Sequence, residues 1–273
     1  MPDMIEPGAQ PDLQTHLAHT ARIYDYFLGG KDNYAADRAA GDATIAAWPA
    51  SRSGALANRA FMRRAARFLA AECGVTQYLD IGTGIPTAPN LHQIAQGVAP
   101  ESRVVYVDHD PIVLAHARAL MVGTPQGATT YIQADLRDPR GILDAPELRA
   151  TLDLERPVAL LLLAIAHFVE DEAQAIGIVD ELVSALPSGS YLALSTATSD
   201  FDPEGLALVQ EQYHKHGQPL AFRTHAQVER LFHGLELVEP RIVQAHKWRP
   251  NPSDVGAFRD VDVAMYAGVA RKP

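Results

Sequence analysis

The residues best suited to chemistry gather around one glycine-rich turn. An apolar run of the β type ends in Asp80 and is followed by Gly82-Thr83-Gly84 and then by a segment with helical spacing. Because glycine has no Cβ, the chain can turn sharply there and a ligand can lie against bare backbone amides. A second β-branched run ends in Asp108, 24 residues after Gly84, close to the offset of about 20 residues at which a carboxylate reaches a ribose. These features predict a nucleotide-type ligand.

The spacing of the glycines separates two classes of nucleotide ligand. A dinucleotide site has the pattern Gly-x-Gly-x-x-Gly, in which the third glycine allows the helix to pack closely on the strand. In this chain Thr87 occupies the third position, directly after Pro86. An NAD-dependent oxidoreductase on a similar sheet therefore stays an alternative, but the sequence disfavours it. Thr87 is expected to cap the helix that follows the turn.

A second unusual stretch lies near the N-terminus, over residues 24–34. It combines aromatic residues, two adjacent glycines and a polar loop in a short span. Aromatic residues at helical spacing usually belong to a core. The alternative is a lid over the ligand, in which Tyr24 offers an aromatic face to a cation and Asp32 and Asn33 add polar contacts. Closure of such a lid would exclude water.

The elements that must position these residues alternate between strands and helices, which predicts an α/β fold. Residues 1–14 are expected to be a mobile N-terminus, residues 15–75 a helical extension or lid, and residues 76–273 the main domain. Within the extension, helices are expected up to Trp48 and again from Leu56. The predicted strands are 77–81, 104–108, 129–135, 158–164, 191–196, 235–243 and 261–270. Pro240 marks the sixth strand as irregular or at an edge.

The balance of charges bears on the class of partner. The chain has 273 residues, 47% of them hydrophobic, and a formal net charge of −10. Phosphate binding needs a basic face, so a nucleic-acid partner is disfavoured. Four arginines do lie on one predicted helix, where a solvated helical face is the simpler interpretation. They are Arg59, Arg63, Arg64 and Arg67.

Cysteine and histidine usage excludes several other classes. Cys73 is the only cysteine, so neither an intrachain disulfide nor a cysteine-rich zinc site can form. None of the eleven histidines belongs to a His-Glu-x-x-His pair, so no metal site is expected. The N-terminus has no signal-peptide core, and the longest apolar run, 158–166, is too short to span a bilayer. A cytoplasmic protein without a membrane partner is expected.

With these residues in place, the chain resembles the class I methyltransferases that use S-adenosylmethionine (SAM). It resembles more closely a mainly actinobacterial S-adenosyl methyltransferase family, formerly catalogued as a domain of unknown function. The resemblance covers most of the chain and rests on the segments RIYDYFLGGKDNY (22–34), LDIGTGIPTAPN (79–90), VYVDHD (105–110), AD (134–135) and AHFV (166–169). It implies a Rossmann-like sheet of seven strands in the order 3-2-1-4-5-7-6 with the last strand antiparallel.

The resemblance also implies the cofactor and the residues that would hold it. SAM would bind beyond the carboxyl ends of the strands, at the switch point between the first and fourth. Asp80 would meet its ammonium, Asp108 its ribose, and Asp135 with Leu136 its adenine. The expected cofactor-binding residues are Tyr24, Asp32, Asn33, Asp80, Gly82, Thr83, Gly84, Asp108, His109, Asp135 and Leu136.

The acceptor of the methyl group is less well defined by sequence. His167, just after the fourth strand, is the candidate general base, and a packing or capping histidine is the alternative. The Asn/Asp-Pro-Pro-Tyr/Phe motif of many nucleic-acid methyltransferases is absent, which favours a small-molecule acceptor. A non-catalytic protein that binds SAM, S-adenosylhomocysteine (SAH) or a partner remains an alternative, as does a SAM-fold enzyme that transfers an aminopropyl group. No residue indicates an oligomeric state.

Overall fold

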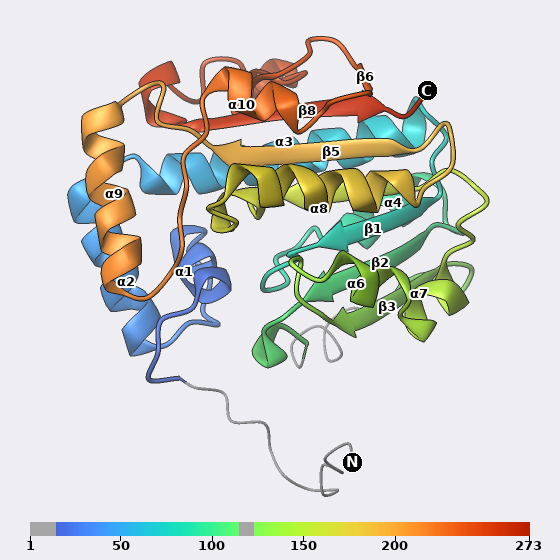
Figure 1. Cartoon of the computed structure of the whole chain (residues 1–273), viewed down its shortest axis with the longest axis horizontal. Coiled ribbons are helices and arrows are strands. Elements are labelled where there is room, and N and C mark those ends of the chain that lie inside the picture. Colours follow the sequence, from blue (N-terminus) through green and yellow to red (C-terminus); the bar gives the residue numbers. More distant parts are fainter. Residues whose placement is uncertain (1–14, 115–122) are drawn as a thin grey trace, which may run out of the picture.

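The computed structural model describes residues 15–114 and 123–273, so the predicted mobile segment 1–14 lies outside the described residues (Figure 1). A mixed sheet forms its centre, in the order β3-β2-β1-β4-β5-β8-β6, and β7 also pairs with β8. β1 to β5 are parallel, and β8 runs antiparallel to β5. The strands are β1 Gln77–Ile81, β2 Arg103–Asp108, β3 Ala128–Gln133, β4 Ala159–Leu163, β5 Tyr191–Ala197, β6 Glu236–Leu237, β7 Val243–Gln244 and β8 Met265–Arg271. The predicted order and the antiparallel last strand are confirmed.

The sheet departs from the prediction at its last edge. The single strand expected over 235–243 is two short strands, β6 and β7, both paired with β8. Between them Pro240 has no amide hydrogen to donate, and Arg241 has a positive φ of 68°. Both features interrupt the ladder of hydrogen bonds, which explains the extra strand. β8 also begins later than expected, because residues Asp260–Asp262 form a 3-10 turn.

Helices cover both faces of the sheet (Figure 1). Leu79 and Ile81 of β1 pack on the face that carries α6 (Pro139–Leu143), α7 (Pro146–Thr151), α8 (Glu172–Ser184) and α10 (His225–Arg230). Tyr78 packs on the opposite face, against α3 (Ser51–Ala71) and α4 (Leu91–Val98). Since successive side chains of a strand alternate between faces, Asp80 lies on the side of α3.

Three helices lie beyond the carboxyl ends of the parallel strands, at the left of Figure 1. They are α1 (Thr20–Phe27), α2 (Ala35–Ala47) and α9 (Pro203–Lys215), and we call them the cap. Trp48 Nε1 donates to Asp202 Oδ2 over 3.0 Å, which joins the end of α2 to the start of α9. Gln218 Nε2 donates to the Ala18 carbonyl over 2.9 Å, which joins the loop after α9 to the start of α1. The cap therefore combines the first and last thirds of the chain.

The helix starts differ from the predictions in two places. Asn90, not Thr87, is the N-cap of α4, and it forms a capping box with Gln93. The Thr87 amide instead donates to Asn90 Oδ1 over 3.0 Å, so the loop before the helix is held by the cap residue. α3 begins at Ser51 rather than at Leu56, which brings its first turn to the strand ends.

The arginine-rich face of α3 is not uniformly solvated, contrary to the expectation. Arg64 is buried, and its Nε donates to the Trp248 carbonyl over 2.8 Å. Trp248 is itself fully buried, and its ring packs against Phe61 and Phe68 of α3. α3 thus belongs to the layer that covers the sheet, although the sequence assigned it to the extension. Over the described residues, every helix is too short or too polar to cross a membrane.

Candidate functional site

The glycine turn after β1 has the geometry that the sequence predicts. Gly82 and Gly84 have φ values of +75° and +67°, in the left-handed region that favours glycine. The Gly82 and Thr83 amides both donate to the Val107 carbonyl, over 2.8 and 3.2 Å, and fix the turn to the end of β2. A Cβ on Gly82 would lie 2.5 Å from Ile165 Cγ1. Glycine is therefore required there by both backbone conformation and space.

Asp108 links the two strand ends that the sequence singled out. Its Oδ2 accepts from the Gly84 amide over 2.8 Å, and its Oδ1 accepts from the Asp110 amide over 3.0 Å. Asp110 in turn accepts from the Ile112 amide over 2.8 Å, as an N-cap does. Asp108 is buried but borders both cavities described below. Its carboxylate is thus held rigidly at the edge of the ligand space.

Asp80 is a buried carboxyl at the end of β1. Its pKa is raised to about 7, mainly by burial, with Arg59 acting in the opposite direction and the nearby Asp108 adding to the rise. A carboxyl in this position is ready to ionise when a cation arrives, because a nearby positive charge favours the charged form.

Arg59 is a site residue that the sequence analysis missed. Its guanidinium donates to the carbonyls of Thr87 and Pro89, in the loop after the glycine turn. Its Nε is buried and has no hydrogen-bond partner among the described residues. Its place on the helix could have indicated this role, because Arg59 lies one helical turn after Ala55, on the face of α3 that borders the first cavity described below.

Two cavities open at the carboxyl ends of the strands. The first extends from Asp80 and the glycine turn into a space between α2, α3 and α9, which we call the chamber. The second, which we call the cleft, runs past Asp108 to Asp135 and Leu136 and is covered by residues 217–219. Aromatic side chains dominate the walls of the chamber, and they are Trp48, Phe168, Tyr213 and Phe222.

The structure brings most predicted cofactor residues to these cavities, but not all of them. Gly82, Thr83, Gly84 and Asp80 border the first cavity, and Tyr24 borders it with a hydroxyl that donates to the Ala55 carbonyl and accepts from Asn58. Asp32 and Asn33 border neither cavity. The Asp32 amide and Asn33 Nδ2 both donate to Asp25 Oδ2, over 3.0 and 2.8 Å, and these contacts order their loop.

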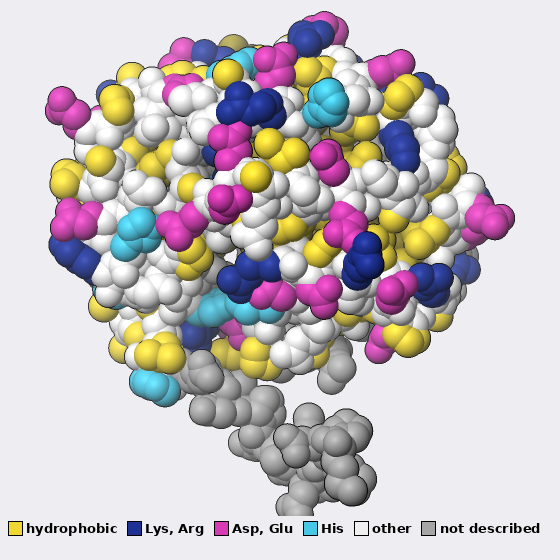
Figure 2. Space-filling view, in the orientation of Figure 1, with side chains coloured by type: hydrophobic (Ala, Val, Ile, Leu, Met, Phe, Trp, Pro, Cys, Tyr) yellow, Lys and Arg dark blue, Asp and Glu magenta, His cyan; other side chains and the backbone are white. Residues whose placement is uncertain are grey.

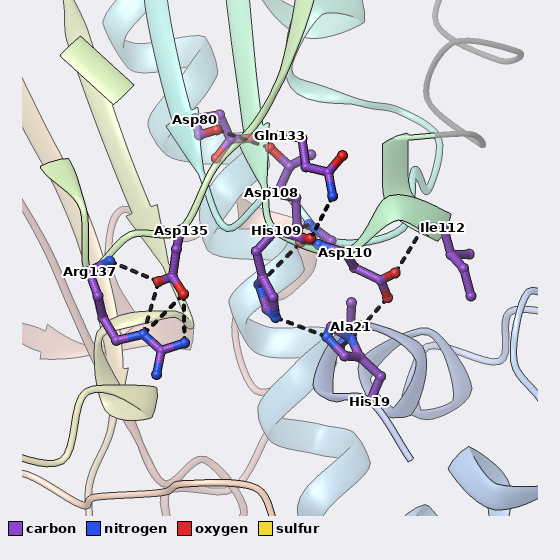
Figure 3. A network of polar contacts seen from close by, with 12 residues as sticks. His19, Ala21, Asp80, Asp108, His109, Asp110, Ile112, Gln133, Asp135 and Arg137 are labelled. Atoms are coloured by element: carbon purple, nitrogen blue, oxygen red, sulfur yellow. Dashed lines mark hydrogen bonds and ion pairs between the residues drawn. The ribbon is translucent and has the colours of Figure 1, made fainter. Parts of the chain in front are cut away.

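His109 joins the end of β2 to the cap (Figure 3). Its Nε2 lies 3.1 Å from Nε2 of His19, the residue that caps α1. His19 Nδ1 lies 3.1 Å from Asp110 Oδ2. Burial lowers the pKa of His19, although Asp110 opposes that shift. This cluster closes the first cavity on the side of the cap.

Asp135 forms an ion pair with Arg137 in the cleft (Figure 3). Arg137 Nη2 donates to Asp135 Oδ2 over 2.6 Å, and its Nε donates to Oδ1 over 2.9 Å. This pairing lowers the pKa of Asp135. The carboxylate that the sequence assigned to an adenine is therefore shared with Arg137, which borders the cleft and was not predicted. Acidic and basic side chains also lie next to one another at several other places on the face shown in Figure 2.

His167 borders the chamber, but its geometry does not suit the base proposed from sequence. Its Nδ1 accepts from the Ala197 amide over 3.2 Å, so the proton of the neutral ring is on Nε2. Burial, with a smaller effect of the nearby Arg223 guanidinium, lowers the pKa of His167 to about 3. Arg223 donates to the carbonyls of Ala166 and Val169 and thereby fixes the turn that carries the histidine. His167 is consequently a neutral hydrogen-bond donor at physiological pH.

Comparison with known proteins gives concordant results. A sequence model of a family described as S-adenosyl methyltransferase matches residues 6–273. The crystal structure of a DUF574 family protein from Streptomyces avermitilis is 58% identical, with a TM-score of 0.93, over 96% of this chain and 100% of that one. A Thermobifida fusca protein described as a candidate methyltransferase is 38% identical, with a TM-score of 0.87, over 96% of this chain and 97% of that one.

More distant matches concern the fold alone. The plantazolicin methyltransferase BpumL, solved with SAH, is 13% identical, with a TM-score of 0.53, over 93% of this chain and 95% of that one. No curated protein matches the chain significantly.

Proposed function

We propose that this chain, which belongs to the S-adenosyl methyltransferase family, transfers the methyl group of SAM to a small, largely apolar acceptor held in the chamber. One observation carries this proposal. A single cavity joins Asp80, the glycine turn and Asp108 to an aromatic-lined space beneath the cap. Such a cavity can hold a donor and an acceptor side by side, and apolar walls with a few polar groups are typical of small-molecule sites.

The residues at the glycine turn fit the cofactor. When bound, SAM supplies an electrophilic methyl group, and its transfer leaves SAH. The buried Asp80 carboxyl, which forms no ion pair with a described residue, suits an ammonium, and the unpartnered Nε of Arg59 suits a carboxylate. Asp108 suits a pair of ribose hydroxyls, because an ionised carboxylate accepts strong hydrogen bonds. The cleft, with Leu136 on one wall, would take the adenine of SAM.

The protein's main contribution to the reaction is then orientation. Transfer from a sulfonium is a direct displacement, and aligning two reactants can lower a barrier by roughly 7–11 kcal/mol at best. Residues of the cap line the first cavity, and His167 offers it a proton donor rather than a base. An acceptor that reacts without early loss of a proton suits this chamber. A His167 that does not act as a base equally suits a protein that only senses SAM, which remains the second candidate function.

Asp108→Ala is expected to weaken SAM and SAH binding at least tenfold. The change removes the carboxylate proposed for the ribose and frees the Gly84 amide that it holds, and a hydrogen bond to a charged group contributes about 1.5–3 kcal/mol. Calorimetric titration of the purified protein with SAM, SAH and NAD measures the effect. Asp144→Ala, which removes an exposed carboxylate paired with Arg149, is the control.

The outcomes of this titration separate the candidate functions. Micromolar SAM or SAH binding that Asp108→Ala weakens and Asp144→Ala leaves intact supports the cofactor assignment. Binding of NAD alone would instead favour the oxidoreductase. Transfer of labelled methyl from SAM to a pool of small aromatic compounds, in the protein that binds SAM, distinguishes an enzyme from a sensor.

A further inference from the structure

Most polar groups that border the chamber are already satisfied by the protein. Thr44 Oγ1 donates to the Ala40 carbonyl over 2.9 Å, and Ser51 Oγ donates to the Trp48 carbonyl over 2.6 Å. The indole nitrogen of Trp48 is bound to Asp202. A hydroxyl or indole N–H that already donates its hydrogen has no donor left for a ligand. These three groups therefore add no free donor to the walls of the chamber.

Two polar groups differ from the rest. His167 is only 6% exposed, and its Nε2–H has no partner among the described residues. The Tyr213 hydroxyl likewise has no partner there, and burial raises its pKa, so the hydroxyl keeps its proton. The Phe168 ring contacts both side chains, because its centroid lies 4.4 Å from the centroid of the His167 ring and 6.3 Å from that of the Tyr213 ring. Both are therefore neutral donors that border the chamber, and both rings contact the same Phe168 ring.

Among the described residues, no acidic, lysine or arginine side chain lines the chamber beside Phe168, and the nearby Arg223 guanidinium is buried behind the turn that carries His167. The acidic and guanidinium side chains that border the first cavity, Arg59, Asp80 and Asp108, all lie at the end of the glycine turn. Burying a charged group without a partner costs far more than burying a neutral one. A charged acceptor would thus make no direct ion pair with the walls beside His167 and Tyr213, whereas a carbonyl oxygen can accept two hydrogen bonds.

We propose that the chamber takes an uncharged, ring-containing acceptor whose carbonyl oxygen accepts hydrogen bonds from His167 Nε2–H and Tyr213 O–H. The aromatic walls pack on the rings, and the two donors fix the orientation. This inference rests on the proposed function and adds the chemical class of the acceptor. It also assigns Tyr213 to the binding site, a residue that the sequence analysis passed over.

Two probes of nearly the same shape test the inference. 2-Acetonaphthone carries a carbonyl, and 2-isopropenylnaphthalene has a methylene group in place of the oxygen. With SAH at saturation, we expect the ketone to bind about tenfold more tightly, since two neutral hydrogen bonds contribute roughly that much. Tyr213→Phe should reduce the preference to about threefold, and His167→Phe combined with Tyr213→Phe should abolish it. Ligand-observed NMR or fluorescence titration measures both affinities.

Tyr26→Phe is the matched control, because it removes a hydroxyl that binds Asp42 outside both cavities. The preference should stay at its original value in this variant. Equal affinity for the two probes, failure of both to bind, or a preference that survives Tyr213→Phe unchanged would overturn the inference. Each of these outcomes leaves the proposed function standing if SAH still binds. Loss of SAH binding in the unaltered protein would instead overturn the proposed function. Should the double variant not fold, Tyr213→Phe alone decides.

Discussion

At pH 8, Asp80→Asn is expected to weaken SAM binding on the order of a hundredfold while making the cofactor-free protein more stable. Asparagine keeps the shape of the side chain but loses the charge proposed for the ammonium. Removing one partner of a buried charge pair costs about 2–5 kcal/mol of binding. The two effects have opposite signs because the same negative charge is favourable with a cation beside it and unfavourable without one.

The effect on stability follows from the pKa of Asp80. The folded protein raises that pKa from 3.8 to about 7, so the folded state holds the proton more tightly than the unfolded chain does. The stability that this proton contributes is fully present below pH 3.8 and is lost as the pH rises through 7. At pH 8 the buried charge costs up to about 4 kcal/mol, from about 1.36 kcal/mol per pKa unit. Asp80→Asn avoids that cost.

Thermal unfolding at pH 5 and pH 8, together with calorimetry, tests both parts. The stabilisation by Asp80→Asn should be large at pH 8 and small at pH 5. In the unaltered protein, the affinity for SAM should fall about tenfold for each pH unit below 7, because the carboxyl must lose its proton to pair with the ammonium. Asp144→Asn, at an exposed position, should change neither quantity. A protein destabilised by Asp80→Asn at pH 8 would contradict this account.

Gly82→Ala should lower the free energy of unfolding by about 2–5 kcal/mol. The left-handed conformation costs an alanine about 1–2 kcal/mol, and inserting a methyl group into a filled space costs typically about 1–3 kcal/mol more. The space is filled because Ile165 Cγ1, Cδ1 and Cβ all lie within 3.0 Å of the position that the Cβ would take. Denaturant unfolding of the two proteins measures the difference.

Gly84→Ala provides a matched control, two residues away in the same turn. Its φ of +67° imposes a similar conformational cost, but nothing lies within 4 Å of the added Cβ. We expect it to lose only about 1–2 kcal/mol. Equal losses in the two variants would show that backbone conformation alone accounts for the glycines, and that contact with Ile165 contributes nothing.

The central strands and the glycine turn could be predicted from sequence because their signals are local. β1 to β5 are runs of apolar or β-branched residues, and strand ends that carry Asp80 and Asp108 meet at one edge of a parallel sheet by topology alone. The strand over 235–243 is irregular and at an edge, as Pro240 predicted, but it is two short strands rather than one, because Arg241 adopts a left-handed conformation that the hydrophobic pattern does not reveal. The start of α4 was misplaced because Asn90 and Thr87 are both good cap residues, and only the fold chooses between them.

The chamber was the part least accessible to sequence reasoning. Its donors depend on which hydrogen bonds are already filled, and that is a property of the packed molecule. His167 was found by its position after the fourth strand, but its role as a base was inferred without the Ala197 amide that occupies Nδ1. Arg59 was grouped with solvated arginines, although the loop after the glycine turn folds back onto it. Tyr213 gave no signal, since an aromatic residue on an amphipathic helix usually belongs to a core.

The join between the first and last thirds of the chain has a consequence for synthesis on the ribosome. The strands on either side of β1, which leads into the glycine turn, are complete by residue 163, and nascent chains generally fold from the N-terminus. The cap closes only when Asp202 reaches Trp48 and Gln218 reaches Ala18, and the last wall of the chamber is Met265. An emerging chain can thus form the turn early, whereas the chamber is complete only after Met265 has been synthesised. A prematurely terminated chain that ends before α9 would carry the turn without the chamber.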